Sequence, residues 1–283
     1  MASRGGGPDT PAPPGAGGAL VRHRYRVAVD DDALLRLLDD TAAAVAEALR
    51  ADAARATASW RDRGERPGQY RIDLVADDAA LDVLRAAGVG ILSEESGLED
   101  RGNDLVVVVD PVDGSTNASR GIPWYATSLC AVDADGPRAA LVVNLATGTR
   151  YQAVRGGGAT RDGLPIEPSS VTSIDQALLV LNGYSPNYLF WRQYRSLGAT
   201  ALDLCSVADG RADGTIDCTT DALGPWDYLG AMLVLGEVGA HVADAKGREL
   251  VVLDHAARRT PVSAATPELF EAVRRAREEL PSW

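Results

Sequence analysis

The stretch DLVVVVDPVDGSTNAS, residues 104–119, indicates how the middle of this chain folds. Four consecutive valines are typical of a strand that is buried on both faces. Pro111 has no N–H to donate to a ladder, so we expect the strand to end there and to present Asp110 at its terminus. Ligand sites favour the ends of buried strands. Gly114 permits a sharp turn, after which STNAS can begin a short helix.

The acids of this stretch and the start of the predicted helix together point to chemistry at a phosphate. Asp110 and Asp113 offer carboxylate oxygens, which are ligands that Mg²⁺ prefers. Free N–H groups at a helix start bind phosphate oxygens. An Asp-Pro-x-Asp-Gly segment can equally be a capped turn, because Asp and Gly favour turns for local reasons. The segment alone therefore leaves both interpretations open.

Two further segments place acids at the ends of apolar elements. Glu94 and Glu95 follow an apolar strand in ILSEESG, and Asp227 lies in the first turn of the apolar helix predicted from GPWDYLGAMLVLGEVG. Each has a simpler explanation: a solvated acid after a strand, or a favourable interaction with the helix dipole. Three acid sites at the ends of apolar elements are less easily accidental. We therefore expect these acids to converge in one pocket that holds paired divalent cations.

Composition and charge exclude several classes of function. The chain has 283 residues, 46% of them hydrophobic, and a net charge of −12 from 28 Lys plus Arg and 40 Asp plus Glu. This balance argues against a nucleic-acid or anionic-membrane surface, and the chain has no apolar run of 18 residues. Cys130, Cys205 and Cys218 are odd in number and form no CxxC pair, so we expect no disulfide framework and a cytoplasmic location.

Local patterns predict the remaining elements. Residues 32–60 carry apolar positions at helical spacing, and YRIDLVA, residues 70–76, is predicted to be a strand followed by a helix that stops at Gly88. The glycine-rich residues 155–166 are predicted to be a loop. Thr266 is expected to cap the last helix.

The order of these elements predicts two domains after a leader. Antiparallel strand patterns dominate the first half, whereas strands and helices alternate in the second half. We therefore predict a disordered leader over 1–20, an α+β domain with the main metal motifs over 21–155, and an α/β domain over 156–283.

Together the three acidic segments resemble the inositol monophosphatase family, within the larger group of Mg²⁺-dependent, lithium-sensitive sugar and nucleotide phosphatases. Its signatures stand here as SEES, DPVDGSTN and WDYLGAMLVLGEVGA, with secondary matches in YQAVRGGGATRDGLPI and RSLGATALDLCSVADGRAD. The likeness covers about residues 33–280. It implies a layered α-β-α-β-α sandwich of the inositol monophosphatase and fructose-1,6-bisphosphatase type, combining α+β and α/β halves.

The resemblance also implies a set of metal ligands and catalytic groups. Asp110 would bridge two Mg²⁺ ions, while Glu94 and the hydroxyl of Ser115 would orient and deprotonate the attacking water. The metal ligands it implies are Glu94, Asp110, Asp113, Asp227 and the carbonyl of Val112.

Substrate-binding residues are implied in the same way. Backbone N–H groups at the start of the short helix would hold the phosphate, two positions would border the sugar or polyol, and one acid would bind its hydroxyls. These residues are Gly114, Ser115 and Thr116, then Gly198 and Thr200, and then Asp217. Asp113 and Asp227 would also line the substrate.

Some positions depart from the family pattern. The acid that helps to hold a third Mg²⁺ has shifted spacing in DLVADDAALD, which leaves Asp77 or Asp78; we take Asp78 as the candidate ligand and expect two or three ions. Ser93 replaces the usual glycine before the Glu pair. His23, His241 and His255 lie outside the motifs, so we expect no phosphohistidine and only incidental histidines.

The sequence thus predicts a Mg²⁺-dependent phosphomonoesterase that acts on a small phosphorylated polyol, sugar or related metabolite. Within the resemblance, myo-inositol 1-phosphate is the first choice, and fructose 1,6-bisphosphate, histidinol phosphate and 3′-phosphoadenosine 5′-phosphate remain open. The alternative is a catalytically weak relative that binds a metal or phosphorylated ligand as a sensor or assembly partner. The resemblance also implies lithium sensitivity and a homodimer.

Overall fold

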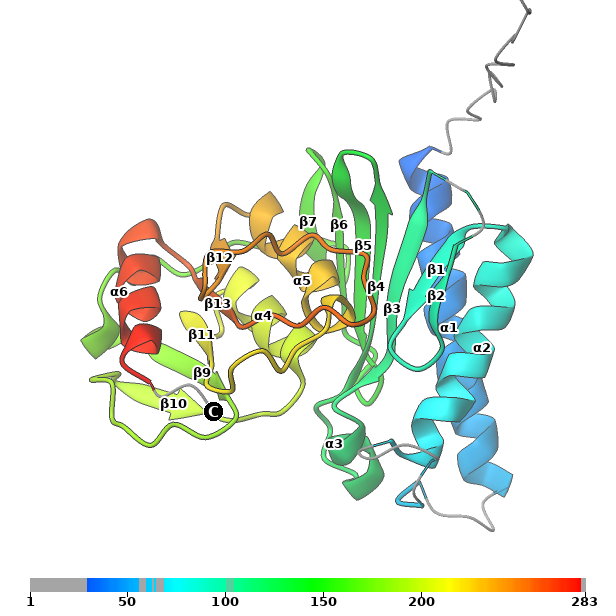
Figure 1. Cartoon of the computed structure of the whole chain (residues 1–283), viewed down its shortest axis with the longest axis horizontal. Coiled ribbons are helices and arrows are strands. Elements are labelled where there is room, and N and C mark those ends of the chain that lie inside the picture. The colour runs from blue at the N-terminus through cyan, green and yellow to red at the C-terminus, as the bar shows by residue number, and fades with distance from the viewer. Residues whose placement is uncertain are drawn as a thin grey trace, which may run out of the picture.

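The chain folds into five layers of helices and sheets. A pair of helices, an eight-stranded sheet, a second pair of helices, a five-stranded sheet and a last helix follow one another across the molecule (Figure 1). This arrangement confirms the expected α-β-α-β-α sandwich. The predicted leader over 1–20 lies outside the described residues. The computed structural model describes residues 30–55, 60–62, 64, 69–100, 102 and 104–280.

The first layer consists of α1 (Asp31–Arg55) and α2 (Arg71–Ala87). The predicted strand over 70–76 is wrong, because these residues begin α2. Tyr70 is the N-cap residue, and its N–H donates to the carboxylate of Asp73 at 2.8 Å. The buried residues recur in pairs every three to four positions, which is the period of a helix and not the two-residue alternation of a strand: Ile72 and Asp73, Ala76 and Asp77, and Ala80 and Leu81. Gly88 ends the helix with a left-handed conformation, as predicted.

Eight strands form the first sheet, in the order β2-β1-β3-β4-β5-β6-β7-β8. β1 and β3 are parallel, and the other neighbours are antiparallel. The predicted loop over 155–166 is wrong, because β7 and β8 lie within it. These two strands of the first sheet follow the domain boundary that was predicted near residue 155. The division into two domains stays a prediction. The bounds are β1 Gly90–Ser93, β2 Gly97–Glu99, β3 Val106–Asp113, β4 Ala126–Asp133, β5 Gly136–Asn144, β6 Arg150–Val154, β7 Gly158–Arg161 and β8 Leu164–Pro165.

The central strand β3 is buried on both faces, as predicted. Val107 and Val109 belong to the apolar core beneath α1 and α2, whereas Val108 belongs to the core on the other side of the sheet. The strand does not end at Pro111, however. The pairing with β4 shifts register between Asp110 and Asp113, and a bulge of this kind needs no ladder N–H from the proline. Both acids therefore lie on the strand itself.

Helices α4 (Thr200–Ala208) and α5 (Pro225–Glu237) form the middle layer between the two sheets. Every residue of α4 after Thr200 is buried, as expected of a helix that is covered on all sides. The free cysteines Cys130, Cys205 and Cys218 are also buried, which agrees with the absence of a disulfide framework. None of the described helices is long and apolar enough to cross a bilayer.

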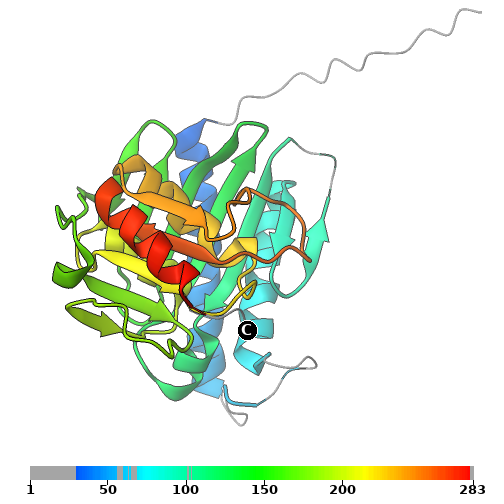
Figure 2. The same ribbon diagram turned by 60° about the vertical axis from the view of Figure 1, so that its left-hand side comes forward.

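The second sheet has the strand order β10-β9-β11-β13-β12. α6 (Pro267–Glu278) packs on β11, β12 and β13, and it begins at Thr266, whose hydroxyl accepts the N–H of Leu269 as predicted (Figure 2). The sequence did not indicate β2, β10 or β13. The bounds are β9 Leu178–Asn182, β10 Gln193–Arg195, β11 Gly214–Asp217, β12 His241–Asp244 and β13 Pro261–Ala264, with the short helices α3 at Ser115–Arg120 and η1 at Ile174–Gln176.

Candidate active site

Three of the predicted ligand acids meet where the end of β3 approaches the start of α5. Asp110 and Asp113 come from β3, and Asp227 comes from the first turn of α5. One carboxylate oxygen from each residue lies within 4.8 Å of the others. Segments that are far apart in the sequence therefore supply one acidic cluster, as the sequence predicted.

Asp110 is the most enclosed member of this carboxylate cluster. Its Oδ1 accepts the N–H of Val112 at 3.0 Å within the bulge. Burial raises the pKa of Asp110 well above its usual range, and the charges of Glu94, Asp113 and Asp227 raise it further. A cation among these oxygens would remove the repulsion between them.

Asp113 connects β3 to the start of α4. Its two carboxylate oxygens accept the N–H groups of Thr200 at 3.1 Å and Ala201 at 2.7 Å. Burial raises the pKa of Asp113 to about 7, and these two hydrogen bonds lower it in part. Asp113 therefore fixes the first turn of α4 beside the cluster.

Glu94 and Asp227 complete the cluster from two further elements. Glu94 follows β1, its side chain hydrogen-bonds with that of Asp110, and burial together with the charge of Glu95 raises its pKa to about 8. Asp227 accepts the N–H of Gly224 at 2.6 Å and so caps α5, while burial and the charge of Glu94 raise its pKa well above the usual range. Asp227 thus lies in the first turn of α5, where an acid interacts favourably with the helix dipole, and this position is compatible with a place in the cluster.

The carboxylate cluster fits a hard divalent cation. Its donors are all oxygens, and burial raises the pKa of each of the four acids, while like charges raise the pKa of Glu94, Asp110 and Asp227 further. A divalent cation supplies the opposite charge that such a group lacks. The donor set therefore suits Mg²⁺ chemistry.

The short helix α3 begins directly beside the cluster. Gly114 precedes it with a φ of 86°, and a Cβ at this position would lie 3.0 Å from both the carbonyl oxygen of Gly198 and the Cβ of Ala199. Only glycine therefore lets the start of α3 approach the start of α4. Ser115 is half-buried, and the exposed Thr116 forms a hydrogen bond of 3.2 Å with the hydroxyl of Tyr70.

Asp217, predicted to bind substrate hydroxyls, lies buried at the end of β11. Its Oδ1 accepts the N–H of Thr219 at 3.1 Å, and within the described residues its Oδ2 has no hydrogen-bond partner. Burial raises the pKa of Asp217 to about 7. Asp217, Thr200 and Asp203 line one small internal cavity. The predicted role of Asp217 stays a prediction.

The candidates for a third metal ligand have different environments. Asp78 is exposed on α2, which gives its predicted role no support. Asp77 is buried and accepts the hydroxyls of Ser93 and Ser96, so it fixes the turn that carries Glu94. Asp73, which the sequence analysis overlooked, lies close enough to raise the pKa of Glu94. Its only sequence signal is the three-residue spacing from Tyr70.

His255 also escaped the sequence analysis. Its Nε2 donates to the carbonyl oxygen of Glu94 at 2.9 Å, and its ring lies 5.0 Å from the ring of Trp226. The guanidinium of Arg258 lies 5.0 Å from the same indole. The expectation that His255 is incidental is therefore wrong, because it connects the backbone of Glu94 to the first turn of α5.

The other histidines differ from His255. His241, on β12, packs against Phe270 of α6 at a ring distance of 5.8 Å. His23 lies outside the described residues. The prediction that no histidine serves as a nucleophile stays a prediction.

The fold and the site define a layered α-β-α-β-α protein with a carboxylate centre suited to divalent cations. The family profile described as the inositol monophosphatase family matches residues 30–282, and the chain belongs to that family. Several of the members that it resembles are named as phosphatases.

Individual relatives agree with this assignment. The chain is 37% identical over 183 residues to a fructose-1,6-bisphosphatase/inositol-1-monophosphatase of Archaeoglobus fulgidus. The matched region covers 63% of this chain and 71% of the relative. It is 34% identical over 226 residues to the protein of the same description from Methanothermobacter thermautotrophicus, covering 71% and 80%. A solved structure of a hypothetical protein from Pyrococcus horikoshii, described as similar to inositol-1 monophosphatase, superposes with a TM-score of 0.78 at 25% identity over 87% of this chain and 99% of that one.

Proposed function

We propose that this chain is a Mg²⁺-dependent phosphomonoesterase that hydrolyses a small phosphorylated metabolite with an activated water. The observation that carries the proposal is the convergence of Asp110, Asp113 and Asp227, whose oxygens lie within 4.8 Å of one another, beside the start of α3. Phosphate monoesters hydrolyse extremely slowly unaided, so the rate must come from charge neutralisation and positioning. A carboxylate cluster next to free N–H groups can provide both.

The cluster residues have separate roles in this proposal. Two or three Mg²⁺ ions are held by Glu94, Asp110, Asp113, Asp227 and the carbonyl of Val112. When bound, such ions lower the pKa of a water and neutralise the charge of the phosphate. The exposure of Asp78 makes it the weakest member of the proposed ligand set.

The surrounding residues orient the reactants. Glu94 and the hydroxyl of Ser115 hold the attacking water and take its proton, which requires no covalent intermediate. The N–H groups of Gly114, Ser115 and Thr116 hold the phosphate oxygens at the start of α3. Gly198, Thr200 and Asp217 border the remainder of the substrate, since the start of α4 is packed directly against Gly114.

The relatives' names give the first substrates to test. Their descriptions as fructose-1,6-bisphosphatase/inositol-1-monophosphatase support myo-inositol 1-phosphate and fructose 1,6-bisphosphate. Histidinol phosphate and 3′-phosphoadenosine 5′-phosphate complete the panel. Phosphate release from these four esters, with and without Mg²⁺, tests the proposal; we expect at least one to be hydrolysed only with Mg²⁺. Release that is equally fast in EDTA would refute metal dependence.

A second candidate function has one observation in its favour. Asp77 is committed to Ser93 and Ser96 and Asp78 is exposed, so the segment expected to hold a third ion differs from the family pattern. A relative with weak catalysis could still bind a metal and a phosphorylated ligand. If all four esters are inert with Mg²⁺ but bind to the protein in equilibrium dialysis, this second function replaces the first.

Three further properties belong to the proposal: lithium sensitivity and dimerisation rest on the family resemblance, and the location rests on the unpaired cysteines. We expect millimolar Li⁺ to inhibit, the chain to form a homodimer, and the protein to work in the cytoplasm. A Li⁺ titration of phosphate release and light scattering of the purified chain test the first two. Activity that tens of millimolar Li⁺ does not inhibit would contradict the first expectation, and a monomeric mass would contradict the second.

A further inference from the structure

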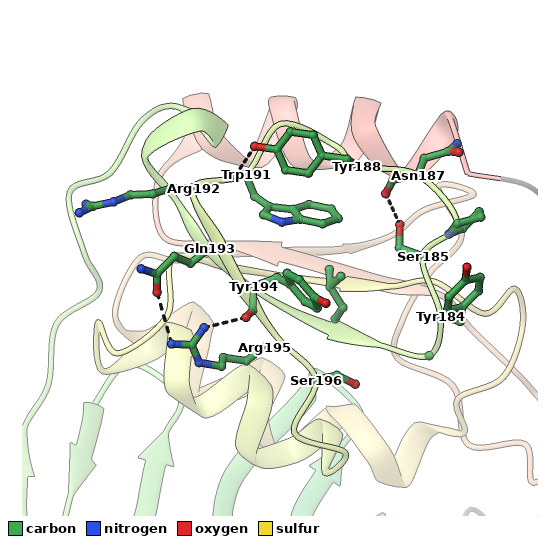
Figure 3. A pocket seen from close by; sticks show the side chains of 13 residues that line it. Tyr184, Ser185, Asn187, Tyr188, Trp191, Arg192, Gln193, Tyr194, Arg195 and Ser196 are labelled. Carbon is green, nitrogen blue, oxygen red and sulfur yellow. Dashed lines mark hydrogen bonds between the residues drawn. The ribbon is translucent and has the colours of Figure 1, made fainter.

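A second pocket lies at the edge of the second sheet, outside the carboxylate cluster. It has a volume of about 830 Å³ and is formed by the segment 181–196, which runs from β9 through β10 (Figure 3). Small-molecule sites commonly have about 300–1,000 Å³. Only Arg195 and Ser196 of this segment belong to a motif of the family resemblance, and the aromatic residues before them have no role in the proposed function.

Aromatic rings dominate the lining of this aromatic pocket. Trp191 is only 7% exposed, whereas Tyr184 and Tyr194 are 73% and 53% exposed. The rings of Trp191 and Tyr194 are 5.4 Å apart, and the buried Leu181 lies beneath them. Exposed tyrosine faces beside a buried indole are suited to stacking on a planar ring of a ligand.

The loop that presents these rings is held in shape by its own contacts. The hydroxyl of Tyr188 donates to the carbonyl of Trp191 at 2.7 Å, and its ring lies 5.3 Å from the indole in an edge-on arrangement. The hydroxyl of Ser185 donates to the carbonyl of Asn187 at 2.7 Å. A pocket that is ordered before binding loses less entropy when a ligand enters.

Charge in the aromatic pocket favours an anionic group. Residues 176–202 contain two arginines and no acid, in a chain that has 40 acids. Arg195 lies beside Tyr194, donating to the carbonyl of Tyr194 at 2.7 Å and to the side chain of Gln193 at 3.3 Å, and among the described residues it forms no ion pair. Its other N–H groups remain able to donate to an anion. Arg192 points away from the rings (Figure 3).

The aromatic pocket is connected to the surroundings of the carboxylate cluster by residues that follow the strands of the second sheet. β9, β10 and β11 are parallel, so the residues that follow them emerge at the same edge. A Cβ at Gly183, after β9, would lie 2.5 Å from the hydroxyl of Thr219, which follows Asp217 on β11.

A second connection passes through the residues after β10. Ser196 lines the pocket and is followed by Leu197, whose carbonyl accepts the side-chain N–H of Asn117 on α3 at 2.7 Å. Gly198 comes next and touches Gly114 at the proposed phosphate site. Ser196 in the pocket and Gly198 at the proposed phosphate site are two residues apart, which corresponds to about 7 Å of extended chain. One ligand of nucleotide size can reach both.

We propose that the aromatic pocket binds the ring end of the substrate, and that this substrate is a phosphomonoester with a planar heteroaromatic ring and a second anionic group. The ring stacks on Tyr184, Trp191 and Tyr194, Arg195 binds the second anion, and the scissile phosphate reaches the carboxylate cluster. This inference rests on the proposed phosphomonoesterase function. A polyol phosphate would occupy the cluster alone and leave the rings uncovered.

The test compares two substrates in variants of exposed pocket residues. 3′-Phosphoadenosine 5′-phosphate carries the ring and a second phosphate, whereas myo-inositol 1-phosphate carries neither. For Tyr184→Ala, Tyr194→Ala and Arg195→Gln we expect kcat/KM for the adenine ester to fall about 5- to 100-fold, with less than about a twofold change for the inositol ester. Arg192→Gln and Leu164→Ala, an exposed residue on β8, are the controls and should leave both values unchanged.

A binding measurement keeps this inference separable from the proposed function. Titration calorimetry with adenosine 5′-monophosphate in EDTA should show binding to wild type that is weakened about 5- to 100-fold in Tyr184→Ala and Tyr194→Ala and unchanged in Arg192→Gln. If no ester is hydrolysed but this pattern is found, the pocket assignment holds and the phosphomonoesterase proposal fails. Equal losses for both esters, or nucleotide binding that ignores both tyrosines, would overturn the pocket assignment.

Discussion

The carboxylate cluster and the aromatic pocket are built in opposite ways. Acids from β1, β3 and α5 form the cluster, and backbone N–H groups of two helices hold them in place. A single segment between β9 and β10 forms the pocket, and its rings are largely exposed. Reaction chemistry therefore depends on long-range packing, whereas substrate preference can change within one loop without disturbing the layers.

The largest effect is expected from a substitution in the cluster. Asp110→Asn should lower kcat/KM for every substrate by at least about 10³-fold, because groups that act as a unit lose most of their effect together. The fold should remain, since the change relieves repulsion among buried charges. Phosphate release and circular dichroism check both statements.

The matched controls separate the cluster from its surroundings. Asp82→Asn removes an exposed acid of α2 and should leave activity unchanged, while Tyr184→Ala should retain activity on the inositol ester. If Asp110→Asn keeps more than a tenth of wild-type activity with Mg²⁺, the cluster is not the reaction centre.

His255→Ala is expected to have an intermediate effect. The hydrogen bond to the carbonyl of Glu94 orients a proposed ligand without touching it, and such outer contacts are typically worth about 10- to 100-fold in metal affinity or activity. We expect the Mg²⁺ concentration for half-maximal activity to rise, with KM for the ester little changed. His241→Ala is the control, because that ring packs against Phe270 instead. An unchanged Mg²⁺ dependence in His255→Ala would show that the contact is merely structural.

Gly114→Ala tests the contact between the starts of α3 and α4. An added Cβ would lie 3.0 Å from the carbonyl oxygen of Gly198 and from the Cβ of Ala199, directly before α4. The alanine would also have to adopt the φ of 86° that Gly114 has. Urea unfolding should show a loss of about 1–3 kcal/mol in the free energy of unfolding. Gly121→Ala has a φ of 72° but no atom within 4 Å of the added Cβ, so it should cost only about 1 kcal/mol. Equal costs for both would mean that the close approach contributes nothing.

The last expected effect is the change with pH in the thermal stability of the metal-free protein. Burial raises the pKa of Asp113 to about 7 and that of Glu94 to about 8, above the unfolded values of about 4. The folded state therefore binds these protons more tightly than the unfolded state does. This contribution to the free energy of unfolding is fully present below about pH 4 and is lost as the pH rises through about 7 to 8. In EDTA the Tm should therefore fall as the pH rises from 5 to 9.

Mg²⁺ should reverse this trend, because cations and protons compete for the same oxygens. The gain in Tm on adding Mg²⁺ should be larger at pH 8.5 than at pH 5.5, and Asp110→Asn should reduce it at both. A gain that is independent of pH would place the bound cation away from Glu94 and Asp113.

The sequence predicted the cluster because each of its acids ends an apolar element, and strand and helix ends meet at sheet edges. It also predicted β3 as a strand with two buried faces. The structure confirms this, because Val107 and Val108 belong to different apolar cores. The errors arose where a short window misleads. YRIDLVA alternates between apolar and polar residues from Tyr70 to Leu74, and the continuation to Ala80 and Leu84 reveals the helical period. Pro111 was expected to end β3, but a bulge accommodates it.

The remaining features have no local signal. His255 and Glu94 are 161 residues apart, and nothing near either residue announces their hydrogen bond. The aromatic residues 184–194 are visible in the sequence, but their common orientation around Leu181 depends on how β9 and β10 pair. Contacts of this kind follow from tertiary packing and require the structure.

The most direct test of the central claim is anomalous diffraction from crystals soaked in Mn²⁺, which takes the same oxygen ligands as Mg²⁺. The account predicts a peak surrounded by the carboxylate oxygens of Asp110, Asp113 and Asp227, at about 2.1 Å from each ligating oxygen. A saturating soak that gives no peak among these three residues would contradict it.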